Sequence, residues 1–374
     1  MIKRILMVHA RYREEGGEDV SVALACDALQ KAGVDVTLLR LPAWGEASWF
    51  PYAAEKRIED ALNRNVYDLV HIHNFFPSAS VALHRSALRR AIPIVQHIRN
   101  ARALCPAARL WREGRVCGDC ASSPWPGIAR GCWRGSRLLT LGATYSVRWQ
   151  MDIWRRVACF VFPSIFLRTA VAPVLGGMPS AIVPNHAPRL LQMPSLKGER
   201  TGVVYAGRLV PEKGVRTLLK ALEWLDPDVS VSVYGVGPLE DEVRQHERRI
   251  RFFGQVPSDD VMCAMEKALV VVVPSVWPEP FGRTALEGLA AGAAVVASSV
   301  GGVPEVVESC GFLVPPGDPK ALAMAMTQAL FVPDDVRHRA RARAQILHQQ
   351  ATHGLIDVYS RCLEKASRHA SIAK

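Results

Sequence analysis

Long apolar stretches are missing from this 374-residue sequence, because no run reaches the roughly 18 residues that a helix needs to cross a bilayer. A signal-peptide cleavage pattern is also missing from its start, which is typical of a first β-strand instead. We therefore expect a protein that has no membrane-spanning helix and stays in the cytoplasm. Its nine cysteines would be reduced there rather than paired as disulfides.

Repeats and low-complexity tracts are absent as well, and strands alternate with helices along the chain. The length is too great for one ordinary core and fits two domains of about 150 to 190 residues. In the first half, the predicted strands are Ile5–Val8, Val34–Leu39, Leu69–Ile72, Ile92–Val95 and Cys159–Phe162, and the predicted helices include Asp19–Lys31 and Ser80–Arg90. In the second half, strands are expected near Val203, Val231, Ile250, Val271, Val295 and Phe312. This alternation predicts an α/β fold with two doubly wound parallel sheets.

The connection between the two domains is expected within Pro184–Arg200, which holds three prolines and no clear periodicity. A last helix is predicted from about Ile356 to Ser371. The expected division is therefore a first domain at residues 1–190, a second at 191–355 and a C-terminal helix at 356–374.

Two carboxylates, Glu279 and Glu287, lie eight residues apart across the start of a predicted helix. The run 268–273 predicts a buried parallel strand, and 284–291 predicts the helix after it. Free backbone N–H groups are expected at the start of this helix, on Phe281, Gly282, Arg283 and Thr284. These donors favour a phosphate, and the flanking carboxylates accept hydrogen bonds from sugar hydroxyls. The pattern suits a nucleoside-diphosphate sugar, although the same spacing without this context is more typical of two solvated helix acids.

Further motifs surround this pair. Gly207-Arg208 and Lys213-Gly214 follow a strand upstream, and glycine-rich segments at 301–305 and 311–318 follow downstream. In the first half, Gly16-Gly17 follows the first predicted strand and His97 the fourth; a lone histidine there would more often be a satisfied buried side chain. Together these motifs resemble glycosyltransferase family 4, the retaining nucleotide-sugar-dependent enzymes with the GT-B fold. The resemblance spans most of the chain and is stronger in the second half.

The resemblance implies two Rossmann-like domains facing across a cleft, with the C-terminal helix crossing back to the first domain. It implies that Arg208 and Lys213 neutralise the diphosphate of a UDP- or GDP-sugar. Glu287 would hold the ribose, Glu279 the transferred sugar, and His97 the donor sugar or the acceptor. Gly16 and Gly17 would let the first-domain loop approach the donor phosphates. Catalysis is expected to need no metal cofactor, and retention would follow front-face displacement within an ion pair.

The net charge of +11 belongs entirely to the first half. Residues 1–190 hold 25 Lys and Arg against 14 Asp and Glu, whereas residues 191–374 hold 21 of each. Arginines concentrate at 85–137, interleaved with Trp111, Trp125 and Trp133. This composition favours an anionic membrane surface and a lipid-linked saccharide acceptor in cell-surface polysaccharide synthesis. The alternative is a solvated basic surface over core tryptophans. Nucleic acid is not an expected partner, because no nucleic-acid motif accompanies the patch.

Four cysteines lie in a basic insertion at about residues 99–137, at positions Cys105, Cys117, Cys120 and Cys132. Cys117 and Cys120 have the spacing of a metal knuckle, and the two outer thiols lie at equal distances along the chain. A structural zinc with four thiolate ligands is one interpretation. A redox pair or unliganded thiols are the others, because the outer spacing is not that of a standard finger.

We expect a glycosyltransferase that moves a sugar from a nucleoside-diphosphate sugar to an acceptor hydroxyl. One rival is a GT-B sugar-nucleotide epimerase, which would need an acid and a base beside the sugar. Another is a noncatalytic protein that binds nucleotide sugars or nucleic acid. Such a protein would most naturally have lost one of the four donor-binding charges, and none is lost.

Overall fold

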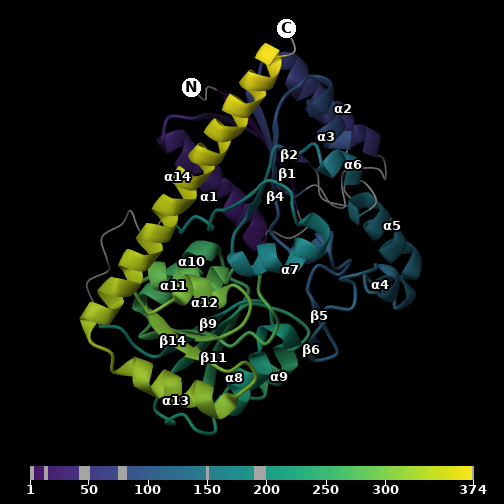
Figure 1. Cartoon of the computed structure of the whole chain (residues 1–374). Coiled ribbons are helices and arrows are strands. Elements are labelled where there is room, and N and C mark those ends of the chain that lie inside the picture. The colour runs from purple at the N-terminus through teal and green to yellow at the C-terminus, as the bar shows by residue number, and fades with distance from the viewer. Residues whose placement is uncertain are drawn as a thin grey trace. The chain divides into compact units, whose positions relative to one another are not determined.

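A computed structural model describes residues 4–11, 16–41, 51–74, 82–148, 151–188 and 199–372 (Figure 1). The chain divides into two compact units. The first unit comprises residues 1–110, 118–186 and 349–374, and the second comprises residues 111–117 and 187–348. Each unit contains a six-stranded sheet whose strands are all parallel, which confirms the predicted fold class.

The sheet of the first unit has the strand order β2-β1-β3-β4-β7-β8. Its strands are β1 (Arg4–Ala10), β2 (Asp35–Leu41), β3 (Leu69–Ile72), β4 (Ile94–His97), β7 (Cys159–Phe162) and β8 (Ser180–Ile182). The helices along this part of the chain are α1 (Gly17–Lys31), α2 (Pro51–Arg64), α3 (Ala82–Arg89), α4 (Trp125–Ala129), α5 (Arg137–Arg148), α6 (Met151–Trp154) and α7 (Ile165–Leu175), with a 3-10 turn η1 (Ala101–Ala103). A two-stranded antiparallel hairpin is formed by β5 (Trp111–Arg112) and β6 (Arg115–Val116).

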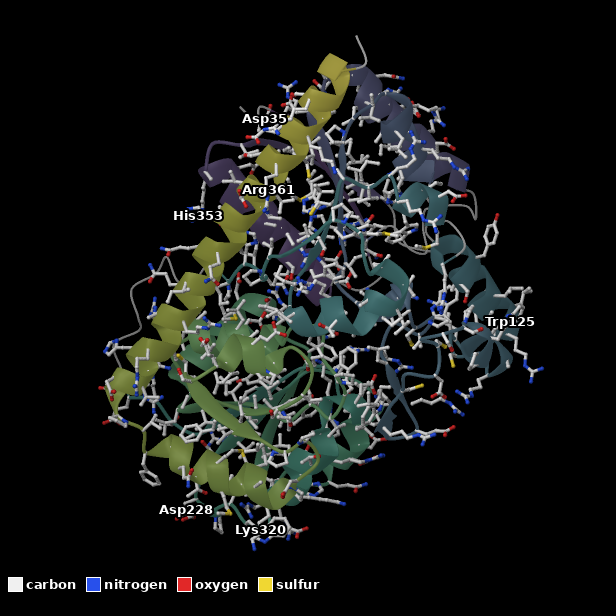
Figure 2. All side chains as sticks on the ribbon, viewed as in Figure 1. Asp35, Trp125, Asp228, Lys320, His353 and Arg361 are labelled. Atoms are coloured by element: carbon white, nitrogen blue, oxygen red, sulfur yellow. The ribbon has the colours of Figure 1, made fainter. Side chains whose placement is uncertain are left out.

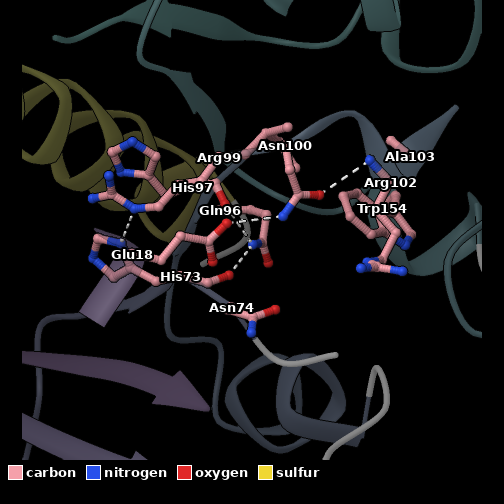
Figure 3. A pocket seen from close by; sticks show the side chains of 11 residues that line it. Glu18, His73, Asn74, Gln96, His97, Arg99, Asn100, Arg102, Ala103 and Trp154 are labelled. Atoms are coloured by element: carbon pink, nitrogen blue, oxygen red, sulfur yellow. Dashed lines mark hydrogen bonds between the residues drawn. The ribbon is translucent and has the colours of Figure 1, made fainter. Parts of the chain in front are cut away.

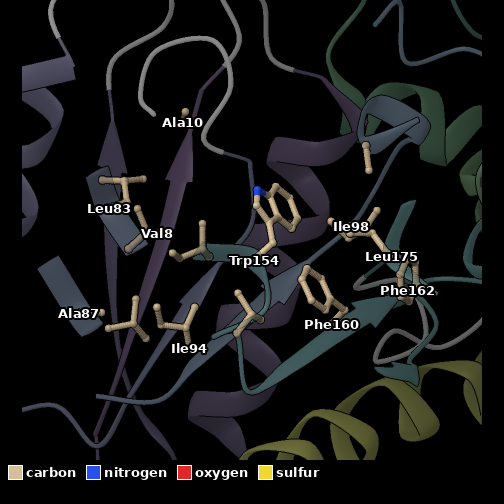
Figure 4. Close-up of a cluster of buried hydrophobic side chains, with 14 of the residues drawn as sticks. Val8, Ala10, Leu83, Ala87, Ile94, Ile98, Trp154, Phe160, Phe162 and Leu175 are labelled. Carbon is tan, nitrogen blue, oxygen red and sulfur yellow. The ribbon is translucent and has the colours of Figure 1, made fainter. Parts of the chain in front are cut away.

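Both faces of this sheet are buried, which explains why its central strands are almost wholly apolar. Side chains alternate between faces, so that Leu6 and Val8 lie in one core and Ile5 and Met7 in the other. The first of these cores also contains Trp154, whose ring stacks on Phe160 at 5.4 Å between centroids (Figure 4).

The sheet of the second unit has the order β11-β10-β9-β12-β13-β14. Its strands are β9 (Val203–Ala206), β10 (Val231–Tyr234), β11 (Ile250–Gly254), β12 (Val270–Val273), β13 (Ala294–Ser298) and β14 (Gly311–Val314). The helices are α8 (Val215–Ala221), α9 (Glu240–Arg244), α10 (Ser258–Lys267), α11 (Arg283–Ala290), α12 (Val303–Val307) and α13 (Pro319–Leu330), with a 3-10 turn η3 (Pro211–Lys213). Here too alternate valines enter opposite cores, Val270 and Val272 on one face and Val271 and Val273 on the other.

The last helix, α14 (Asp334–Ile372), is longer than predicted and begins well before Ile356. Its early small residues, Ala340 and Ala344, are buried in a core of the second unit. Further along the helix, the larger side chains Leu355 and Tyr359 are buried in a core of the first unit. Because alanines carry much of the early buried face, the apolar periodicity there is weak and the sequence pattern missed it.

Strand β8 was also not predicted, because it is short and only partly buried. The predicted connection Pro184–Arg200 lies partly outside the described residues, as do the first residues of the chain and of the predicted helix Ser80–Arg90. The two units divide at His186 and Ala187, within that predicted connection. Among the described helices, none is both long and apolar enough to span a bilayer.

Candidate active site

The predicted donor-binding residues of the second unit follow two strands that are neighbours in the sheet. Strand β9 lies between β10 and β12, so the strand order reverses at this point of the sheet. Open α/β sheets bind ligands at such a switch point. The turn 207–214 follows β9 and the loop 274–282 follows β12.

Backbone contacts hold these two segments together. The carbonyl of Glu212 accepts hydrogen bonds from the backbone N–H of Val276 (3.0 Å) and of Trp277 (3.4 Å). Gly214 has a left-handed backbone (φ 71°), and a Cβ atom there would lie 1.8 Å from the carbonyl oxygen of Pro274. Only glycine therefore permits this approach.

Glu279 is a buried carboxylate held by the neighbouring segment. Lys213 Nζ lies 2.7 Å from Glu279 Oε1, and Ser275 Oγ donates a hydrogen bond to the same oxygen. Burial alone would raise the pKa of Glu279, but the charge of Lys213 and these hydrogen bonds outweigh it and leave that pKa below its usual value. The carboxylate is therefore ionised at neutral pH, and it orients the ammonium group of Lys213, which also lies 5.7 Å from the centre of the Trp277 ring.

Glu287 is the second acid and lies one turn inside α11. Its Oε1 is 2.8 Å from Arg283 Nε, an ion pair of neighbouring helical turns. Gly282 precedes the helix with φ 97°, and a Cβ atom there would meet the Val303 side chain at 2.9 Å. The helix start carries Phe281, Gly282, Arg283 and Thr284 as predicted, and its first N–H groups have no partner within the helix.

The remaining predicted donor-binding residues are less enclosed. Arg208 is exposed in the turn after β9. Gly16 is the N-cap of α1, and its N–H donates to Asp19 Oδ2 at 2.9 Å. Gly17 is the exposed first residue of that helix. The structure thus brings Lys213 to Glu279 and Arg283 to Glu287, whereas the assigned ligand contacts stay predictions.

His97 is the last residue of β4 rather than the residue after it, and it belongs to a buried histidine cluster. The ligand atoms of His71, His73 and His97 all lie within 4.8 Å of one another. These three side chains are 0%, 1% and 4% exposed. Burial, the largest cause, lowers the pKa of His71 to about 3 and holds the pKa values of His73 and His97 well below the usual range. All three rings are therefore neutral at pH 7.

Sequence reasoning missed His71, His73 and the neighbouring Arg99. The Arg99 Nε donates to His73 Nδ1 at 3.2 Å, and Arg99 Nη1 donates to Asn185 Oδ1 at 2.5 Å. His73, His97 and Arg99 line a pocket together with Asn100, Arg102 and Glu18 (Figure 3). The available signal was the alternation His71-x-His73 at the end of a strand that neighbours β4 in the sheet.

The four cysteines of the predicted zinc site do not belong to a comparable cluster of potential ligands in the part of the chain that the structure describes. Among the described residues, the only group of three or more potential metal ligands within the same spacing is the histidine cluster, and it contains no cysteine. All four cysteines are free thiols. A structural zinc there stays a prediction, for which metal analysis of untagged protein and thiol titration are the direct measurements.

The two parallel-sheet units define the class of this protein as an α/β protein of the GT-B fold. Sucrose-phosphate synthase from Thermosynechococcus elongatus superposes with a TM-score of 0.68 at 19% identity, over 97% of this chain and 100% of that chain. The Anabaena protein HepE, in complex with UDP, superposes with a TM-score of 0.63 at 18% identity, over 98% of this chain and 100% of that chain. At these identities the likeness concerns the fold.

Sequence models assign the family. The model described as "Glycosyl transferase 4-like domain" matches residues 2–186, and the model described as "Glycosyl transferases group 1" matches residues 200–331. This chain therefore belongs to glycosyltransferase family 4, which confirms the resemblance drawn from its motifs.

Curated relatives agree with this assignment. Glycogen synthase from Mycobacterium tuberculosis is 36% identical over 162 residues, 40% of this chain and 39% of that protein. Phosphatidyl-myo-inositol mannosyltransferase from Mycolicibacterium smegmatis is 29% identical over 370 residues, 88% of this chain and 84% of that protein. The chain thus spans about two fifths of the first relative and most of the second.

Proposed function

We propose that this protein is a retaining glycosyltransferase that moves a sugar from a nucleoside-diphosphate sugar to an acceptor hydroxyl. The observation that supports it best is the ionised, buried Glu279 held by Lys213 at the switch point of the second sheet. A buried charge pair is weak evidence for stability, because desolvation offsets most of its attraction. Its presence at a ligand-binding edge fits a functional role instead.

In this proposal, the bond between the anomeric carbon and the diphosphate oxygen breaks, and negative charge grows on the diphosphate. Lys213 and Arg208 stabilise that charge together with the N–H groups at the start of α11. The acceptor oxygen bonds to the same face of the anomeric carbon, and its proton passes to a departing diphosphate oxygen. Glu279 holds hydroxyls of the transferred sugar, while Glu287 holds the ribose. No metal cofactor takes part in this scheme.

The donor is the first quantity to measure. UDP is bound in the HepE structure, and a UDP- or GDP-sugar is the donor that we expect for this chain. A thermal-shift panel of UDP-, GDP- and ADP-sugars should raise the melting temperature for one base only, because a ligand of the native state stabilises it. Transfer of a radiolabelled sugar from that donor to a membrane extract then tests turnover. If none of the donors shifts the melting temperature, the proposal is wrong.

We place the acceptor at an anionic membrane surface. Large apolar side chains are exposed in the basic segment and in helix α5, which follows it: Val116 (60%), Trp125 (60%), Leu138 (77%) and Tyr145 (57%). Arg134 and Arg137 lie exposed among them, whereas Trp133 packs partly into the core. Figure 2 labels Trp125 in this segment. We call Trp125, Arg134, Arg137, Leu138 and Tyr145 the basic aromatic patch.

A surface of this kind suits lipid headgroups, because aromatic rings favour the interface and each basic residue contributes about 1 kcal/mol near anionic lipid. It fits a lipid-linked saccharide acceptor, and phosphatidyl-myo-inositol mannosyltransferase and an Escherichia coli O-antigen chain mannosyltransferase are among the relatives. The variant Arg134→Ala/Arg137→Ala/Leu138→Ala should bind vesicles of anionic lipid several-fold more weakly at low salt.

The matched control is Arg216→Ala/Arg244→Ala/Met324→Ala, which removes exposed residues of the same kinds from the second unit. This control should bind the vesicles normally, and both variants should bind the donor. Equal vesicle binding by wild type and the patch variant would contradict the membrane assignment and leave the transferase assignment standing.

A further inference from the structure

The histidine cluster of the first unit has the spacing of a metal site. The positions of the ring protons, however, favour a ligand that accepts hydrogen bonds. Arg99 has only N–H donors, so Nδ1 of His73, which receives the hydrogen bond from Arg99 Nε, carries the lone pair. In a neutral ring the proton then lies on Nε2. A protonated ring nitrogen does not bind a metal, but it donates a hydrogen bond to oxygen.

That donor is buried without a partner. Among the described residues, His73 Nε2 and both ring nitrogens of His97 have no hydrogen-bond partner, and each atom is shielded from solvent. One of the two His97 nitrogens must also carry a proton. A buried polar group without a partner is costly, so two such donors at the ends of adjacent strands favour a bound ligand.

Charge selects the kind of ligand. Arg99 lies close enough to lower the pKa values of all three histidines, and it donates hydrogen bonds to two neutral groups, His73 and Asn185. The three histidines bring no carboxylate to a metal cation, and the Glu18 carboxylate that lines the same pocket accepts a hydrogen bond from Asn100 Nδ2 at 3.0 Å. An oxyanion gains from the guanidinium charge and accepts both N–H bonds, whereas a cation is repelled.

We infer that His73, His97 and Arg99 form an oxyanion subsite that receives a phosphoryl group. The pocket that they line lies beyond the carboxyl ends of β3 and β4, on the side of the sheet where α/β proteins bind ligands. His71 supports the subsite through its Nδ1, which lies 2.6 Å from the Tyr359 hydroxyl. Phosphate binding itself does not depend on the proposed function; only its source, a phosphorylated acceptor or the donor diphosphate, rests on that function.

The test is titration of the full chain with inorganic phosphate, followed by calorimetry and by ¹⁵N spectra of labelled imidazoles. We expect saturable binding of one phosphate, with the His73 and His97 signals shifting. Binding should fall at least tenfold in Arg99→Gln and in His73→Leu. Arg85→Gln, which removes an exposed arginine of the same unit, is the matched control and should bind normally.

Two competition experiments identify the molecule that supplies the phosphoryl group. Competition by UDP or GDP assigns the subsite to the donor, whereas competition by a short-chain prenyl phosphate but not by nucleotide assigns it to the acceptor. Absence of saturable phosphate binding, or equal binding by wild type and Arg99→Gln, overturns the inference. Stoichiometric Zn²⁺ binding that is lost in His97→Ala, without phosphate binding, overturns it in favour of a metal site. Phosphate binding in a protein without transferase activity would contradict only the proposed function.

Discussion

The two parallel sheets of this protein differ in the charge of the side chains at the carboxyl ends of their strands. In the second unit, the carboxyl edge carries paired full charges, Lys213 with Glu279 and Arg283 with Glu287. In the first unit, the corresponding edge carries neutral imidazoles beside Arg99, and Arg102 and Glu18 line the same pocket. Because the central strands of both sheets are buried and largely apolar, the difference lies in the residues at the strand ends. The same architecture therefore carries paired charges at the strand ends of one unit and a neutral imidazole cluster at those of the other.

The largest effect should follow from removing a cation of the second unit. We expect Lys213→Ala and Arg208→Ala each to lower kcat by at least about a hundredfold, the scale for one preorganised electrostatic donor. Lys220→Ala, which removes an exposed lysine from the adjacent helix, is the control and should keep normal turnover. Near-normal kcat in both test variants would show that the charges of this edge are structural.

Lys213→Ala also leaves the Glu279 carboxylate buried without its cation, which is destabilising in itself. The double variant Lys213→Ala/Glu279→Gln removes that charge. Comparing its melting temperature with that of the single variant separates the two effects. We expect stability to recover while turnover stays low.

A smaller effect should distinguish the two glutamates of the second unit, Glu279 and Glu287. Glu287→Ala should weaken binding of the free nucleoside diphosphate about tenfold, because its proposed partner is the ribose. Glu279→Ala should leave that affinity unchanged and impair transfer. Calorimetry with the nucleotide decides between them, and Glu223→Ala controls for loss of an exposed acid. An equal loss of nucleotide affinity in both variants would contradict the separate roles assigned to Glu279 and Glu287.

Acidification should distinguish the two units at the level of stability. Burial is the main cause that lowers the pKa of His71 to about 3 and of His84 to about 4, against 6.5 for a free imidazole. Below pH 6.5 the unfolded chain takes up protons that the native first unit does not. Its free energy of unfolding therefore falls as pH decreases from about 6.5 towards 4, by about 2 kcal/mol for each such histidine at pH 5.

Hydrogen exchange, corrected for its intrinsic pH dependence, measures this effect strand by strand. Between pH 7 and pH 5, protection should fall in β3 and β4 and change less in β12 and β13, whose side chains hold no ionisable group. His84→Asn should remove part of the fall in β4. Equal losses in both sheets would mean that the histidines are not the cause.

Much of the architecture was predictable from local pattern. Strands β3 and β7 were predicted at their observed bounds, because both are short runs of apolar residues between polar segments. The glycine turn at Gly214 and the start of α11 were recognisable as well, because a left-handed backbone or a helix start demands particular residues locally. The order of these turns along the chain then matched the motifs of the family.

Sequence alone thus determined the alternation of strands and helices, the family and the identity of the charged residues after β9 and β12. Only the tertiary structure decided which of those charges meet. Lys213 and Glu279 are 66 positions apart, and their contact depends on β9 and β12 being neighbours in the sheet. The same holds for His71, His73 and His97, which converge because β3 pairs with β4. Periodicity reports the burial of each segment, whereas strand order and the resulting loss of solvent set which side chains interact and how their pKa values shift.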